Sequence, residues 1–266
     1  MSAWWIDSLS GWVLATSLAM ARVYSCLIFV PIFGFHELKG PLRYAIVIMI
    51  SIMVAPGIRE AVVDNHSWTT MAGLYAKESM LGIILGVLLS MPFWLFESVG
   101  ALFDNQRGAL MGGQLNPSLG QDFTPLGYLF KQVLIVLMIT TGAFLHLLQI
   151  IWDSFLLWPP TEWLPVPQPD AFDVYLGLLS STFKDMVLYA LPLVALLLLI
   201  EFGMSILSVY APQLQAFILA MPLKALVGIG FLVLYCPMLF SLADQRNQEL
   251  LTFKHILLLL FKPQGP

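Results

Sequence analysis

Long runs of apolar residues recur along this chain, and they constrain its fold more than any other feature of the sequence. A helix needs about 20 apolar residues to cross the hydrocarbon core of a bilayer. Hydrophobic residues make up 59% of the 266 residues, and charged residues only 11%. The sequence therefore predicts an all-α, polytopic membrane protein of helical hairpins. It has about six hydrophobic runs, of which the second is marginal in length: Gly11–Phe35, Tyr44–Ala55, Met71–Phe96, Leu126–Trp152, Val187–Val209 and Leu223–Leu242.

The charge balance and the reactive residues argue against several classes of protein. The formal net charge is −4, which gives no basic surface for nucleic acid, so we expect no nucleic-acid partner. Cys26 and Cys236 lie inside apolar runs and are interpreted as small hydrophobic residues. The four histidines are scattered, and neither a glycine-rich phosphate loop nor a G-x-S-x-G motif occurs. We therefore expect no enzyme activity, no cofactor and no metal site.

Polar residues concentrate in the segment Met91–Gly127. Glu97 and Asp104 are seven residues apart, so on a continuous helix they share a face, and Arg107 is within pairing distance of Asp104. With Gln106, these residues form a polar stripe that would face a channel or a partner subunit. Spacing supports the alternative equally well, namely a helix end that emerges into water with Asp104 and Arg107 as a solvated pair.

The segment that follows, Gly108–Pro125, is rich in Gly, Pro and Asn. Irregular backbone cannot face lipid, because hydrocarbon offers no partner to its N–H and C=O groups. The segment also carries little charge and keeps several apolar side chains, unlike most solvated connectors. It is therefore a candidate for a loop that plugs or constricts a passage, and an ordinary connector is the alternative. The proposed plug residues are Met111, Gly112, Gly113, Gln114, Leu115, Asn116 and Pro117.

Arg22 and Glu201 are charged residues inside apolar runs. A charge at the centre of a membrane helix costs about 2.5 to 3.5 kcal/mol on insertion scales, so each is expected to face protein or water. Glu201 could serve proton or ion coupling. The favoured interpretation is a paired charge inside a subunit interface.

A second concentrated feature is the predicted turn Tyr210–Lys224, in which two prolines bracket a short amphipathic stretch. It is interpreted as the cytoplasmic tip of a C-terminal hairpin. An ordinary connection in which Lys224 only sets orientation is the alternative. The residues proposed to contact a partner are Pro212, Gln213, Met221, Pro222 and Lys224.

The loop Ser154–Asp173 contains three acidic residues, no Lys or Arg, and several Pro and Trp residues. The positive-inside rule places it outside the membrane, whereas the loops with Lys39, Arg107 and Lys224 belong inside. Its composition also marks the best internal boundary. We expect residues 1–157 to form an N-terminal part, 158–173 a stiff connector, and 174–266 a C-terminal hairpin and tail.

Several motifs occur together in one order and spacing, and they identify a family: Lys77-Glu78, Pro92-Phe93-Trp94, Glu97-Ser98-Val99-Gly100, Asp104-Asn105-Gln106-Arg107-Gly108-Ala109, Asn116-Pro117, Ala211-Pro212-Gln213 and Met221-Pro222-Leu223-Lys224. Over nearly its whole length the chain resembles the T subunit of the bacterial type III secretion export apparatus. It is most similar to the virulence-type (Ysc-like) branch, which is homologous to flagellar biosynthesis protein R. Val209 and Gln215 stand where family members commonly have Arg and Asn, so individual polar contacts there can differ.

The resemblance implies a structural and gating subunit of an export channel in the bacterial inner membrane. One T subunit would assemble with five R and four S subunits, and unfolded proteins would pass through. Residues 1–157 would be R-like and residues 174–266 S-like, with both termini in the periplasm. The loop after Asp104–Ala109 would be the plug, and the tip Pro212–Lys224 would meet the U switch subunit. The V export-gate protein is a further implied partner.

Two other functions remain open from the sequence. The first is an autonomous secondary transporter that uses Arg22 and Glu201 as a coupling pair. Such a transporter should show repeat symmetry in its hydropathy, and none is visible. The second is an assembly scaffold in the membrane without a gating role.

Overall fold

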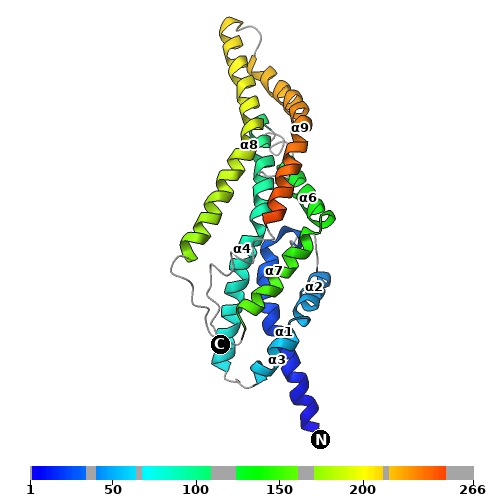
Figure 1. The fold of residues 1–266 in the computed structure, drawn as a ribbon. Coiled ribbons are helices and arrows are strands. Elements are labelled where there is room, and N and C mark those ends of the chain that lie inside the picture. The colour runs from blue at the N-terminus through cyan, green and yellow to red at the C-terminus, as the bar shows by residue number, and fades with distance from the viewer. Residues whose placement is uncertain are drawn as a thin grey trace. The chain divides into compact units, whose positions relative to one another are not determined.

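Helices form all the regular structure in the described residues of this computed structural model, which are 2–33, 40–63, 68–108, 124–160, 171–211 and 216–249 (Figure 1). This confirms the predicted all-α class. The helices are α1 (Ser2–Phe29), the short 3-10 helix η1 (Pro31–Phe33), α2 (Pro41–Ile52), α3 (Ala55–Val63), α4 (Trp68–Arg107), α6 (Pro125–Thr140), α7 (Ala143–Leu157), α8 (Ala171–Tyr210) and α9 (Ala216–Glu249).

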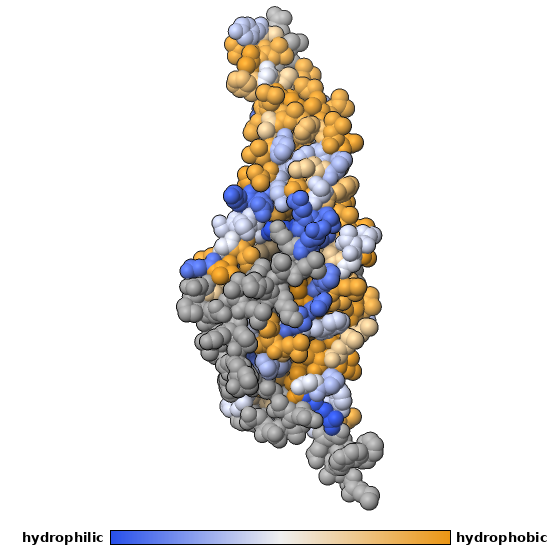
Figure 2. All heavy atoms as spheres, viewed as in Figure 1, coloured by the Kyte–Doolittle hydropathy of each residue, from blue (hydrophilic) through white to orange (hydrophobic). Residues whose placement is uncertain are grey.

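Within the part of the chain that the structure describes, four helices are long and apolar enough to cross a membrane, and α6 with α7 would make a fifth crossing if the two form one span. This confirms a polytopic membrane protein. Figure 2 shows apolar residues over much of the face that it draws. The four long segments are Leu9–Phe29, Trp68–Arg107, Ala171–Tyr210 and Leu219–Gln248.

The chain forms two compact units. Unit 1 comprises Met1–Met91, Gly142–Gly177 and Glu249–Pro266, and unit 2 comprises Pro92–Thr141 and Leu178–Gln248. Both α4 and α8 pass from one unit into the other. The units group residues by contact, whereas the predicted R-like and S-like parts divide the sequence by resemblance, so that second division stays a prediction.

In unit 1, α2 and α3 follow one another along α1 and pack against it. Tyr44 of α2 stacks on Tyr24, with ring centroids 5.9 Å apart, and Arg59 of α3 lies 5.2 Å from the ring of Trp12. The two helices therefore run antiparallel to α1. With 12 residues, α2 is about 18 Å long at 1.5 Å per residue, too short to cross alone.

The end of the second apolar run differs from the prediction. The run was predicted to extend to Ala55, but α2 ends at Ile52, the chain turns at Met53–Val54 and α3 begins at Ala55. A proline in the first turn of a helix lacks only an N–H that would have no helical partner there. Pro56 therefore belongs to the start of a helix.

The fourth predicted run, Leu126–Trp152, is also divided. The helix α6 ends at Thr140, and Gly142 has φ of 79° at the N-cap of α7. The hydroxyl and the backbone N–H of Thr141 both donate to the Leu137 carbonyl in the last turn of α6, at 2.8 and 2.9 Å. A left-handed glycine then lets the chain change direction, which hydropathy does not reveal.

In unit 2, α9 and the unit 2 part of α8 each bury a narrow stripe of residues at spacings of three and four. On α8 the stripe is Thr182, Met186, Ala190, Leu193 and Leu197, and on α9 it includes Ala220, Lys224, Leu232, Leu239 and Ala243. Most other sides of both helices carry exposed apolar side chains, such as Leu191 and Leu234. These sides are suited to lipid or to the apolar surfaces of other subunits.

Close helix packing in unit 1 depends on two glycines. A Cβ atom on Gly86 would lie 2.6 Å from the carbonyl oxygen of Cys26, and one on Gly82 would collide with the carbonyl oxygen of Arg22. The two glycines are one turn apart on α4, so together they allow its backbone to touch that of α1. Small residues at this spacing are a common contact between membrane helices.

We predict that Gly86→Ala lowers the stability of the protein in detergent by about 1 to 3 kcal/mol, the usual cost of overpacking. The matched control is Gly203→Ala on α8, where an added Cβ meets nothing within 4 Å. This control should be neutral or slightly stabilising, because alanine favours a helix more than glycine does. Thermal unfolding of both variants measures the difference, and equal shifts would contradict the packing role.

Candidate functional site

Arg22 is the centre of a fully buried charge cluster in unit 1. Its guanidinium binds the Glu78 carboxylate in two places, Nε to Oε2 at 2.7 Å and Nη2 to Oε1 at 3.0 Å. Both side chains are 0% exposed. This paired geometry is the arrangement in which an arginine binds a carboxylate most strongly.

The remaining donors of the cluster hold the end of α7. Arg22 Nη1 donates to the Ser154 carbonyl at 2.8 Å, and Nη2 donates to the Trp158 carbonyl at 2.9 Å. Lys77 Nζ lies 3.0 Å from Glu78 Oε1 and donates to the Pro160 carbonyl at 2.9 Å. The last carbonyls of a helix have no partners within the helix, and cations are favoured there. The cluster therefore fixes the start of the predicted connector to α1 and α4.

This arrangement shows what Arg22 contacts. The sequence predicted that Arg22 faces protein or water, and in the structure its partner is Glu78 of the same chain. Glu201, for which a paired charge was the favoured interpretation, is paired with Lys224 of unit 2, so Arg22 and Glu201 each have a separate partner among the described residues. Glu78 was not among the predicted site residues, because Lys77-Glu78 contributed only to the family resemblance. Two adjacent charges inside the apolar run Met71–Phe96 were the signal that could have identified the partner.

We predict that Glu78→Gln destabilises the protein by about 3 to 5 kcal/mol, because it leaves the Arg22 charge buried without its counter-ion. The control is Glu97→Gln, which removes a carboxylate paired with Lys131 at 2.7 Å but 36% exposed. Loss of an exposed pair usually costs less than about 1 kcal/mol. Denaturation in detergent compares the two variants, and a control as damaging as Glu78→Gln would refute the importance of burial.

The polar stripe predicted on α4 holds together the two ends of the proposed plug loop. Asp104 is 0% exposed, so it is not half of a solvated pair. Its Oδ1 accepts from Arg107 Nε at 2.8 Å, and its Oδ2 accepts from the backbone N–H of Leu126 at 2.7 Å. Leu126 lies in the first turn of α6, where free N–H groups favour a carboxylate. Asp104 therefore joins the last turn of α4 to the first turn of α6.

Two glycines bring α4 and α6 into direct backbone contact beside this carboxylate. A Cβ on Gly100 would lie 2.5 Å from the Leu126 carbonyl oxygen, and one on Gly127 would lie 2.8 Å from the Glu97 carbonyl oxygen. The Glu97–Lys131 ion pair adds a second link between the helices. The end of α4 and the start of α6, which flank the proposed plug loop, are thus held against each other. Its residues Met111–Pro117 lie outside the described residues.

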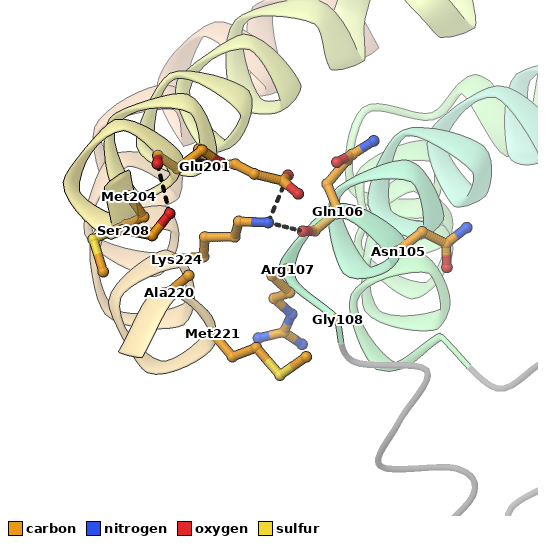
Figure 3. A pocket seen from close by; sticks show the side chains of 11 residues that line it. Asn105, Gln106, Arg107, Gly108, Glu201, Met204, Ser208, Ala220, Met221 and Lys224 are labelled. Carbon is orange, nitrogen blue, oxygen red and sulfur yellow. Dashed lines mark hydrogen bonds and ion pairs between the residues drawn. The ribbon is translucent and has the colours of Figure 1, made fainter. Parts of the chain in front are cut away.

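A pocket of about 400 Å³ in unit 2 brings together the other predicted residues (Figure 3). The last turn of α4 contributes Gln106 and Arg107, and α8 contributes Glu201, Met204, Ser205 and Ser208. The contribution of α9 is Ala220, Met221 and Lys224. The polar stripe, the intramembrane Glu201 and the tip residues were separate hypotheses in the sequence, and the structure places members of all three around one pocket.

Lys224 connects the three helices. Its Nζ donates to Glu201 Oε2 at 2.7 Å and to the Gln106 carbonyl at 3.4 Å, as Figure 3 shows. The Gln106 carbonyl belongs to the last turn of α4, where a cation is favourable. Met221 lies beside Gly108, which ends that helix with φ of 84°. The start of α9 therefore holds the end of α4 immediately before the proposed plug loop.

The connection between α8 and α9 is shorter than the predicted turn Tyr210–Lys224. The helix α9 begins at Ala216, so Met221, Pro222 and Lys224 lie in a helix and not in a turn. Pro222 lies inside α9, beyond its first turn, where it cannot donate a hydrogen bond to the carbonyl four residues earlier. Pro212 and Gln213 lie outside the described residues. Lys224 is only 9% exposed, and its ammonium is already bound within the chain.

Comparison with known proteins identifies the family. The family described as "Bacterial export proteins, family 1" matches residues 13–250. The chain belongs to this family. It is similar to Yop proteins translocation protein T of Yersinia pestis, with 34% identity over 235 residues that cover 88% of this chain and 90% of the relative.

Two further relatives show the breadth of the family. Surface presentation of antigens protein SpaR of Salmonella typhimurium is 29% identical over 225 residues, covering 84% of this chain and 83% of the relative. Flagellar biosynthetic protein FliR of Escherichia coli is 23% identical over 235 residues, covering 87% of each. These matches confirm the resemblance predicted from the motifs. Identity is higher to the Yop translocation protein than to the flagellar protein, in agreement with the predicted branch.

The Lys224–Glu201 pair allows a test of whether Lys224 acts through contacts within this chain or through contact with a partner. We predict that Lys224→Glu impairs export, because it places two carboxylates together and removes the cation from the end of α4. The exchange variant, Lys224→Glu with Glu201→Lys, restores the attraction between positions 201 and 224 and should recover part of the activity. Secretion into the culture medium measures both. An exchange variant as inactive as the single variant would indicate instead that Lys224 is needed by a partner.

Proposed function

We propose that this chain is a structural and gating subunit of a type III protein export channel in the bacterial inner membrane. One copy would assemble with five R and four S subunits, next to the U switch subunit and the V export-gate protein. Unfolded proteins would be the cargo. Membership of the bacterial export family, the similarity to the Yop translocation protein and to SpaR, and the membrane-length helices support this proposal.

The observation that carries the gating role is the anchoring of the proposed plug loop. The buried Asp104 binds both Arg107 at the end of α4 and the N–H of Leu126 at the start of α6. A loop whose two ends are fixed together can close a passage reproducibly, because its closure does not depend on distant parts of the chain. We assign the closing surface to Met111–Pro117.

The pocket provides a route by which the C-terminal hairpin can influence this loop. Lys224 holds the Gln106 carbonyl, and Met221 lies beside Gly108, at the point where the loop begins. A partner that moves α8 and α9 would therefore also release or tighten the end of α4. We assign the partner contact at the tip to Pro212 and Gln213, with the U subunit as the partner.

The two alternatives have weaker support. A secondary transporter that couples through Arg22 and Glu201 would need these charges to act as a pair, and each has a different partner within the described residues. An assembly scaffold would account for the apolar outer faces of α8 and α9. It would not account for the contacts that the buried Asp104 makes at both ends of one loop of little charge.

Deletion of Gly112–Asn116 tests the proposed gate. We predict that the R, S and T subunits still assemble, because the deleted residues lie outside the helical contacts described above. The membrane should become permeable to ions and small molecules, since the closing surface is lost. Native mass spectrometry measures assembly, and conductance across a planar bilayer measures the leak. An assembled complex with unchanged conductance would remove the gating role and favour the scaffold.

A further inference from the structure

The pocket between the end of α4 and the hairpin α8–α9 has a chemistry that the gating proposal does not use. Glu201 is half-exposed at 49%, although it follows a long apolar stretch of α8 and lies nine residues before the end of that helix. Ser205 and Ser208 follow on the same face of α8, at spacings of four and three. A carboxylate at such a position is stable only beside water or a polar group. The pocket is large enough for roughly a dozen water molecules at about 30 Å³ each.

The charged side chains that line the pocket are balanced by partners of opposite charge. Lys224 is paired with Glu201, and Arg107 is paired with Asp104. Among the described residues, no group of three or more metal-binding side chains occurs. A small anion or a metal ion would therefore gain little here, whereas a neutral ligand with both donors and acceptors would not be repelled.

The uncharged polar groups that line the pocket can form hydrogen bonds with the N–H and C=O groups of a peptide backbone. The Gln106 carboxamide offers donors and an acceptor, like a peptide group, and its side chain makes no hydrogen bond to another described residue. The hydroxyls of Ser205 and Ser208 donate to carbonyls of their own helix, which leaves their oxygens able to accept. Met204 and Met221 add flexible apolar surface, which adapts to different side chains.

We propose that this pocket binds extended, unfolded polypeptide during export, through backbone hydrogen bonds and contacts with its two methionines. The inference rests on the proposed export function and names a contact site for the cargo outside the plug loop. Because the pocket binds backbone groups, which all segments share, and carries no unpaired charge, it accepts segments of many sequences. It adjoins Gly108, so a bound segment lies beside the base of the proposed plug loop.

Photo-crosslinking tests the site in the complete export apparatus. The probe is an exported protein of the same bacterium fused to a fast-folding domain, which stalls in the channel. A photoreactive p-benzoylphenylalanine replaces Ser205, which is exposed and lines the pocket. The matched control replaces Leu199, which is 67% exposed on the opposite side of the same helix. A third position, Leu115 in the proposed plug, reports passage of the cargo.

We expect Ser205 to crosslink to the stalled cargo and Leu199 to do so at least about fivefold less. Gln106→Leu should lower the Ser205 yield about fivefold, the effect of one hydrogen bond of ordinary net strength. Equal yields at Ser205 and Leu199 would overturn the inference. So would a Ser205 crosslink to the chain itself that is unchanged by cargo, because the pocket would then be filled internally.

The same experiment separates the inference from the proposed function. Cargo crosslinked at Leu115 but not at Ser205 would overturn the pocket assignment and leave the gating role intact. Cargo crosslinked at neither position, in cells that export normally without this chain, would overturn both.

Discussion

Inside a membrane, every charge and every backbone carbonyl at a helix end needs a partner from the protein itself, and this requirement organises the chain. Arg22 meets it most completely, because its guanidinium binds Glu78 twice and also binds the carbonyls of Ser154 and Trp158. Removing the carboxylate would leave a buried charge, which is far more costly than never having placed one there. The cluster therefore determines how α1, α4 and α7 meet in unit 1.

The same rule operates at the ends of α4 and α6 in unit 2. Asp104 satisfies an N–H at the start of α6, and Lys224 satisfies a carbonyl at the end of α4. These are ordinary helix-end interactions of opposite sign. Here they occur on either side of one loop, so capping two helices also anchors the candidate gate. A structural need and a proposed function are thus served by the same side chains.

The exposed surfaces of α8 and α9 are mostly apolar. The helices α8 and α9 bury one stripe each and present apolar residues elsewhere, as only a protein surrounded by lipid or by other apolar subunits can do. Within that apolar surface, Glu201, Ser205 and Ser208 form a polar face directed at the pocket. The contrast between the two kinds of surface is the reason to seek water and cargo at the pocket and lipid or subunits elsewhere.

Sequence alone determined the helical class, the long membrane segments and the family, because each depends on composition or on motifs that are local in the chain. It also singled out Arg22, Asp104, Glu201 and Lys224, since charges are rare and costly in apolar runs. Only the tertiary structure decided their partners, because Arg22 and Glu78 are 56 residues apart and Lys224 and Gln106 are 118 apart. The turn at Gly142 and the start of α9 at Ala216 were likewise missed, since hydropathy averages over a window and does not register one left-handed residue or a proline accommodated inside a helix. Pairing across that distance is set by how glycines let the helices approach, and no local pattern records it.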